Sequence, residues 1–216
     1  MAVTSTHEMT APAVSSKPTL TLRIALSSCA LVGIGLAILY LKKKQTPPPP
    51  HTDCPPLGSI VHYHKGIPIY SNGLQAFESH GKHYAADGYY YGHKWQCVEF
   101  IKRYFHDAHK HHMPNVWGHA KDYFHPELAH GALNPDRNML QFHNGSDQAP
   151  QVNDLLVWNN PPYGHVAIIA EVHHDHIVVA QQNIIGAPTQ RFPLTHHNGS
   201  FTINDDIQPA GWLRLP

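Results

Sequence analysis

Residues 92–100 read Gly92-His-Lys-Trp-Gln-Cys97-Val-Glu-Phe100, and they open a segment whose apolar residues recur at helical spacing. This spacing predicts an amphipathic helix from Trp95 to about His109, with Cys97 in its first turn. The unpaired N–H groups and the dipole at a helix start stabilise a thiolate, which lowers a thiol pKa that is otherwise about 8.5. Cys97 is therefore a candidate nucleophile, although a buried packing role is the alternative that its position alone leaves open.

The chain after Pro150 reads as strands instead of helices. Strands are predicted at residues 154–158, 165–172, 176–180 and 211–215, with turn signals at 159–163, 173–175 and Asn198-Gly199. A helix that carries a cysteine, followed by an antiparallel sheet, predicts an α+β domain.

His165 stands where a core strand would normally begin with an apolar residue, directly after Gly164. A histidine at a strand edge can pair with Cys97 as imidazolium and thiolate, which activates the cysteine. If strands 165–172 and 176–180 form a hairpin, the side chains of His165, Gln181 and Asn183 share one face. Either Gln181 or Asn183 could then accept a hydrogen bond from the imidazole.

Aromatic residues crowd the approach to Cys97. Tyr89-Tyr90-Tyr91 and Trp95 suit the wall of a narrow cleft, and they suit a core equally well. We expect Tyr91, Trp95 and Gln96 to contact a substrate.

The composition excludes some functions and leaves the histidines unexplained. Lys and Arg number 15, as do Asp and Glu, so the formal net charge is zero and a general nucleic-acid binder is disfavoured. Three cysteines cannot form the disulfide framework of a small secreted domain. Two of the His-rich segments are 109–112 and 173–176, but neither has a zinc signature such as H-E-x-x-H. We therefore predict no metal site.

The first 54 residues differ from the rest of the chain. Residues 1–19 are predicted to be a disordered tail, and residues 20–41 a transmembrane helix, since Ile24 to Leu41 contain no charge. A buried soluble helix is the alternative. Residues 42–54 form a basic and Pro-rich linker, and residues 55–216 the folded domain. The lysines at 42–44 argue for an uncleaved single-pass anchor, with the domain on the cytoplasmic side more readily than in the periplasm.

Four separated motifs, in order along the chain, resemble those of the CHAP domain, the family of cysteine- and histidine-dependent amidohydrolases/peptidases. They are Trp95-Gln-Cys-Val-Glu-Phe100, Asn144-Gly-Ser146, Gly164-His-Val-Ala-Ile168 and Gln182-Asn183. The resemblance runs from about Gly66 to Trp212 and is strongest to the amidase domain of glutathionylspermidine synthetase/amidase.

The resemblance implies a papain-like fold in which Cys97 attacks an amide carbonyl, His165 moves the proton and a thioester is hydrolysed, with no cofactor. The residue that orients the histidine in that amidase is a glutamate, and its counterpart here is Gln181. A glutamine orients the ring but supplies no negative charge. Acidic residues such as Glu78, Asp87 and Glu99 could attract a polyamine, but such residues usually belong to a solvated surface.

The sequence thus predicts a membrane-anchored thiol amidohydrolase with Cys97, His165, Gln181 and Asn183 in the catalytic site. The expected substrate is a small amide or peptide, such as glutathionylspermidine, which would yield glutathione and spermidine. Two alternatives stay open. One is a CHAP-type enzyme that cleaves cell-wall peptidoglycan, and the other is a binding module that keeps the fold without turnover.

Overall fold

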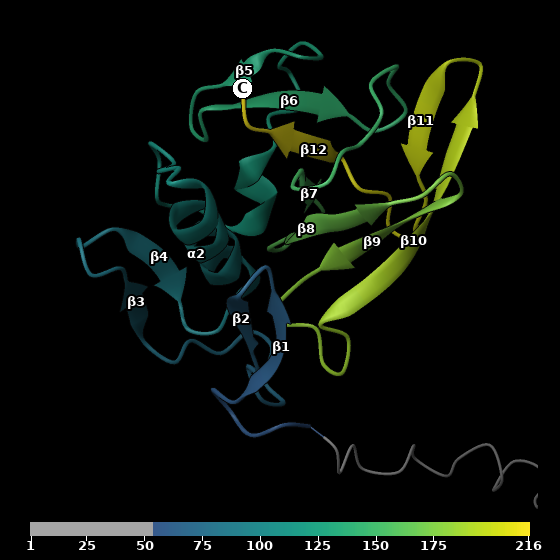
Figure 1. Ribbon diagram of the computed structural model, residues 1–216. Helices are drawn as coiled ribbons and strands as arrows, with labels where there is room; N and C mark the ends of the chain where they lie inside the picture. Colours follow the sequence, from purple (N-terminus) through teal and green to yellow (C-terminus); the bar gives the residue numbers. More distant parts are fainter. Residues whose placement is uncertain (1–53) are drawn as a thin grey trace, which may run out of the picture. The chain divides into compact units, whose positions relative to one another are not determined.

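An eight-stranded antiparallel sheet forms the centre of residues 54–216, the part of the chain that the computed structural model describes (Figure 1). The strand order is β11-β10-β9-β8-β7-β12-β6-β5. The strands are β5 (Leu133–Asn134), β6 (Met139–His143), β7 (Leu155–Trp158), β8 (His165–Val172), β9 (His176–Ala180), β10 (Thr189–His197), β11 (Ser200–Ile203) and β12 (Gly211–Arg214). The sheet curls strongly from β5 to β11, so one concave side faces the helix.

Two small hairpins, one α-helix and one 3-10 turn complete the described fold. The hairpins are β1 (Ile60–His64) with β2 (Ile67–Tyr70), and β3 (Lys82–Tyr84) with β4 (Tyr90–His93). The helix is α2 (Cys97–His109), and the 3-10 turn is η1 (Ala120–Tyr123). Helix α2 contacts β2, β4 and β8, which places its first turn beside the start of β8.

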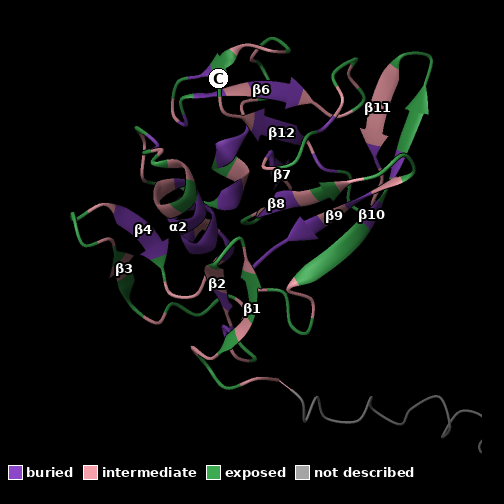
Figure 2. Cartoon of the chain, viewed as in Figure 1, coloured by how far each residue is buried: buried purple, intermediate pink, exposed green. Residues whose placement is uncertain are grey.

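The side chains of the central strands alternate between two hydrophobic clusters. In β7, Leu155 and Val157 belong to the cluster under α2, whereas Leu156 and Trp158 belong to the cluster on the other face. Figure 2 shows the buried residues concentrated in α2 and in these central strands. This alternation is the period of two expected when both faces of a strand are covered.

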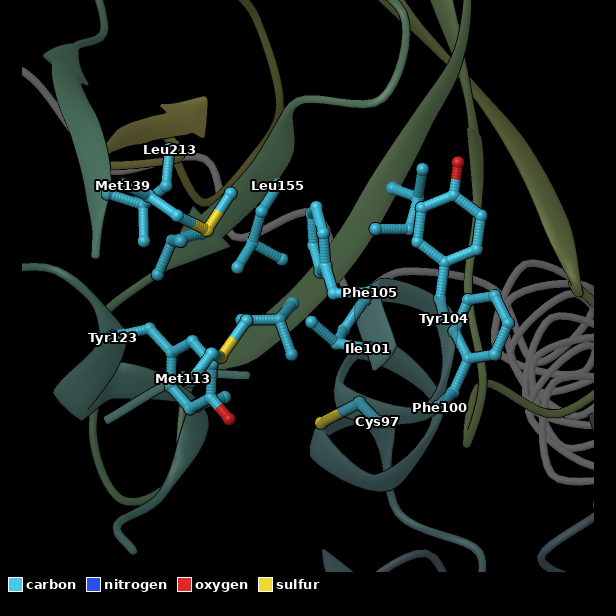
Figure 3. Packing of buried hydrophobic residues seen from close by; sticks show 14 of the residues in the cluster. Cys97, Phe100, Ile101, Tyr104, Phe105, Met113, Tyr123, Met139, Leu155 and Leu213 are labelled. Atoms are coloured by element: carbon cyan, nitrogen blue, oxygen red, sulfur yellow. The ribbon is translucent and has the colours of Figure 1, made fainter. Parts of the chain in front are cut away.

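Helix α2 is held to the sheet by one apolar face. Phe100, Ile101, Tyr104 and Phe105 are fully buried, and Figure 3 shows them packed against residues of the sheet. Burial of a large apolar side chain contributes about 1.5–3 kcal/mol, so this face fixes the helix firmly. Cys97 lies at the start of the same face, one turn before Ile101.

The predicted elements around the site are confirmed. Strands β8 and β9 have the predicted bounds, and β7 and β12 differ from theirs by one residue. The helix begins at Cys97 instead of Trp95, because Gln96 has extended backbone angles and serves as the N-cap. The prediction omitted hairpin β10–β11, although its turn at Asn198-Gly199 was recognised.

The predicted tail at 1–19, the predicted membrane helix at 20–41 and nearly all of the linker at 42–54 lie outside the described residues. Within residues 54–216, α2 is the longest helix, and none reaches the length and apolar character needed to cross a bilayer.

Candidate active site

Cys97 and His165 open onto one cavity of about 600 Å³. Cys97 comes from the first turn of α2 and His165 from the first position of β8. The backbone N–H groups of Val166, Val98 and Cys97 are near enough to the thiol to lower its pKa, so the sulfur lies beside the residue that follows His165. The structure therefore brings together the two residues that the sequence paired.

Gln181 fixes the protonation pattern of His165. Its side-chain oxygen lies 2.9 Å from Nε2 of His165, while its amide nitrogen lies 3.0 Å from the carbonyl oxygen of Ala187. The Ala187 oxygen only accepts, so the amide must present its N–H₂ there and its oxygen to the ring. Nε2 of His165 consequently carries the proton, and Nδ1 keeps the lone pair of a general base.

Gly164 allows His165 to occupy this place. Its φ is +71°, and a Cβ at this position would lie 2.3 Å from the carbonyl oxygen of Trp158 and 2.7 Å from the backbone nitrogen of Lys121. Only glycine fits such a close approach of three backbone segments in a left-handed conformation. The turn before β8 is thus pressed against η1, and His165 follows directly from it.

Burial of the pair acts against the thiolate that the sequence predicts. Burial raises the pKa of Cys97 to about 11, and the three backbone N–H groups offset this only in part. Burial also lowers the pKa of His165 to about 4, against the hydrogen bond to Gln181. The helix start favours a thiolate, but loss of water at the site disfavours either charge more strongly. Burial therefore favours an uncharged thiol and an uncharged imidazole in the resting site.

Gln96 and Asn183 form the rim beside Cys97, and both line the cavity. Nδ2 of Asn183 donates to Oε1 of Gln96 at 2.8 Å, and Nε2 of Gln96 donates to the backbone oxygen of Glu78 at 2.7 Å. Asn183 was expected as an alternative partner of His165, but its side chain is engaged at this rim. The hydrogen-bonded partner of the imidazole is Gln181.

Tyr91 and Trp95 were expected to contact the substrate, and neither lines the cavity. The Tyr91 hydroxyl turns to the outer side of α2, where it donates to Asp107 at 2.7 Å. The Trp95 ring packs on Tyr70, with ring centroids 4.0 Å apart. Successive side chains of a strand point to opposite faces, so it is Tyr90 that reaches the cavity.

Glu99 belongs to no solvated surface. It is fully buried, and its carboxylate receives hydrogen bonds from His83 (2.7 Å), Arg103 (2.7 Å) and Gln182 (2.7 Å). Although burial acts in the opposite direction, these bonds hold the pKa of Glu99 below its usual value. We call Glu99, Arg103, His83 and Gln182 the Glu99 cluster. Gln182 also donates to the backbone oxygen of Gln96 at 3.0 Å, which joins this cluster to the residue before Cys97.

The cavity lining is aromatic and carries no Asp, Glu, Lys or Arg among the described residues. Glu78, Asp87 and Glu99, which the sequence offered as polyamine ligands, are not part of it. The rings on its walls are those of Phe77, Tyr90, Trp117 and Tyr163, with His93 and His119. Phe77 and Trp117 are exposed by 81% and 62%, so they flank an open mouth. Sequence reasoning missed both, because they lie in segments without helix or strand periodicity.

Comparison with known proteins identifies related chains. Residues 88–183 match the family model of the CHAP domain. The bifunctional glutathionylspermidine synthetase/amidase of Escherichia coli (strain K12) is 31% identical over 180 residues, which cover 73% of this chain and 29% of that protein. The trypanothione synthetase of Crithidia fasciculata is 28% identical over 176 residues, with 74% and 27% covered. The chain thus spans less than a third of the length of these relatives.

Proposed function

We propose that this chain, whose residues 88–183 match the CHAP family model, is a thiol amidohydrolase of that family that cleaves glutathionylspermidine or a closely similar amide. The observation that carries the proposal is the shared cavity of Cys97 and His165, with Nδ1 of His165 left free as a base by the bond to Gln181. The relatives support the substrate class, because the Escherichia coli protein is named a glutathionylspermidine synthetase/amidase.

The reaction starts from the neutral pair. As the sulfur of Cys97 attacks the amide carbonyl carbon, Nδ1 of His165 takes the thiol proton, and the carbonyl oxygen becomes an oxyanion. The imidazolium then gives this proton to the amine that leaves, and a thioester on Cys97 remains. Water attacks the thioester with His165 as base, so the acid is released and the thiol restored.

Two donors near Cys97 suit the oxyanion. One is the backbone N–H of Cys97 at the start of α2, where the helix supplies no acceptor. The other is the side-chain amide of Gln96, which lines the cavity and uses one of its two hydrogens on Glu78. Asn183 holds the Gln96 side chain in place from the other end.

The aromatic walls suit an amine that carries positive charge. Nζ of Lys102 already lies 4.7 Å from the ring centroid of Tyr90. A cation over the face of a Trp ring gains about 0.5–2 kcal/mol, so the exposed ring of Trp117 can receive an ammonium without a carboxylate. The amine half of the amide would therefore lie along these rings, and the acyl half beside Gln96 and Asn183.

Product analysis with purified full-length chain tests this function. We expect release of glutathione and spermidine from glutathionylspermidine, and a rate at least about 10³-fold lower for Cys97→Ala and for His165→Ala. Cys54→Ala, which removes a half-buried thiol outside this cavity, is the matched control and should keep the rate. Cleavage of peptidoglycan fragments instead would replace the substrate but keep the mechanism, whereas no cleavage of either would favour a binding module.

We further propose that residues 20–41 anchor the domain in a membrane as a single span, with the domain on the cytoplasmic side. The support is the uncharged run from Ile24 to Leu41 followed by three lysines. The chain should stay with membranes after a high-salt or carbonate wash, and deletion of residues 20–41 should release it. Protease added to intact cells or spheroplasts should leave residues 55–216 uncut, and cleavage there would reverse the orientation.

A further inference from the structure

A second group of ionisable side chains lies on the outer side of α2, away from the cavity of Cys97. Asp87 lies in the turn between β3 and β4, His106 in the last turn of α2, and His112 in the segment after it. One ligand atom from each lies within 4.8 Å of the other two. Both Nε2 atoms approach the same carboxylate oxygen of Asp87, that of His106 at 3.0 Å and that of His112 at 3.9 Å.

A second carboxylate orients His106 for ligation. Nδ1 of His106 lies 2.7 Å from Asp107, and the Tyr91 hydroxyl holds the same carboxylate oxygen at 2.7 Å. A carboxylate on Nδ1 fixes the tautomer that leaves the Nε2 lone pair for a metal ion, an arrangement common around metal-bound histidines. Nε2 of His106 now donates to Asp87 at 3.0 Å, and a metal ion bound between the two would take the place of that proton.

The spacing suits a small divalent ion. Bonds of about 2.0–2.2 Å to nitrogen and oxygen place tetrahedral ligand atoms about 3.3 Å apart. The Asp87–His106 spacing of 3.0 Å is close to this. The Asp87–His112 spacing is 3.9 Å, and the His112 ring is stacked on that of His106 at 4.7 Å and 4°, so this half-exposed side chain would have to turn toward the ion. Two imidazoles and one carboxylate favour Zn²⁺, Co²⁺ or Ni²⁺ over Mg²⁺ and Ca²⁺, which prefer oxygen.

We propose that Asp87, His106 and His112 bind a divalent transition-metal ion such as Zn²⁺, with water completing its coordination. Asp87 and Asp107 together balance the two positive charges of the ion. The ion would join the β3–β4 turn to the end of α2 and to the segment after α2. The turn and that segment are already linked by the hydrogen bond from the Met113 N–H to the Tyr89 hydroxyl. The role is structural, because none of the three ligands lines the cavity of Cys97.

Thermal unfolding of the chelator-treated full-length chain tests the site. The Cys97→Ala background is used so that Zn²⁺ cannot act through the thiol. At a Zn²⁺ concentration about 100 times the Kd, we expect the Tm to rise by about 5–10 °C and one equivalent to bind. Mg²⁺ at the same concentration should give no comparable rise. Asp87→Asn and His112→Ala, both at exposed positions, should each abolish the rise.

His173→Ala is the matched control for a chain so rich in histidine. The rings of His173 and His176 are also nearly parallel, at 7° and 4.2 Å, but their nitrogens contact different carboxylates, Glu171 and Asp175. This variant should keep the full Zn²⁺ effect. An equal rise in His112→Ala, or a rise lost equally in His173→Ala, would overturn the proposed site.

Discussion

Gln181 and Gln182 are neighbours in the chain and both are buried, yet they bind different kinds of polar group: an imidazole in one case and a carboxylate in the other. Gln181 accepts a hydrogen bond from the imidazole of His165, whereas Gln182 donates to a full carboxylate in the Glu99 cluster. The difference teaches that this domain places a paired charge in its scaffold. Burial disfavours charge on the reacting groups next to it.

The largest expected loss of stability comes from removing the charge of the Glu99 cluster with Glu99→Gln. The variant leaves the buried guanidinium of Arg103 without its carboxylate, and loss of one partner of a buried pair costs about 3–5 kcal/mol of unfolding free energy. Urea unfolding at pH 7 measures it. Glu78→Gln, at an exposed position, is the matched control and should change stability by less than about 0.5 kcal/mol.

The same variant has a defined pH dependence. Because the folded pKa of Glu99 lies below its usual value of 4.5, its ionised form stabilises the fold above that pH, and the contribution is lost as the pH falls through the folded pKa. The stability gap between wild type and Glu99→Gln should therefore narrow at acid pH. A gap that is constant down to acid pH would show that the charge of Glu99 is not what stabilises the cluster.

The neutral side can be tested by alkylation of Cys97. If the thiol is neutral at rest, the rate with iodoacetamide should rise about tenfold per pH unit between pH 6 and pH 8, since only the thiolate reacts. Mass spectrometry of the peptide that contains Cys97 separates its signal from those of Cys29 and Cys54. A fast rate at pH 6 that disappears in His165→Ala would instead establish a resting ion pair.

The smallest effect is expected for Gln181→Glu. This variant would place a carboxylate beside His165, as Glu99 already places one beside Gln182. A carboxylate beside Nε2 favours the imidazolium, so the pKa of His165 should rise and alkylation at pH 6 should become faster. The carboxylate would also face two acceptors, the oxygens of Ala187 and Gln190, each now 3.0 Å from the amide nitrogen. We expect a stability loss of about 1–3 kcal/mol for these unmade bonds. Unchanged alkylation would mean that the charge of the third residue has no influence on the pair.

The sequence was sufficient to predict the helix and strands that carry Cys97, His165 and Gln181, because their apolar residues follow helical or alternating periods. It was not sufficient for β10, in which Pro193 interrupts the short alternation of Phe192 and Leu194 and most other positions are exposed. Proline within an apolar run argues against a strand unless partners elsewhere in the sheet accept it.

Residues whose role depends on distant partners were placed wrongly. Glu99 looked solvated because its partners His83 and Gln182 are remote in the chain. His112 was considered only with its neighbours at 109 and 111, and no local pattern joined it to Asp87. The preference for thiolate at a helix start was sound physics, but the depth of the sulfur depends on tertiary packing.

His165 begins β8 and Gln181 directly follows β9, its partner in one hairpin, while the nucleophile belongs to a separate helix. The side chains of Gln182 and Asn183, just after this hairpin, both donate to Gln96, Gln182 to its backbone oxygen and Asn183 to its side chain. Because the apolar face of α2 packs on the sheet, the separation of the sulfur from the imidazole is set by this packing, whereas the tautomer of the ring is set within the hairpin region by Gln181.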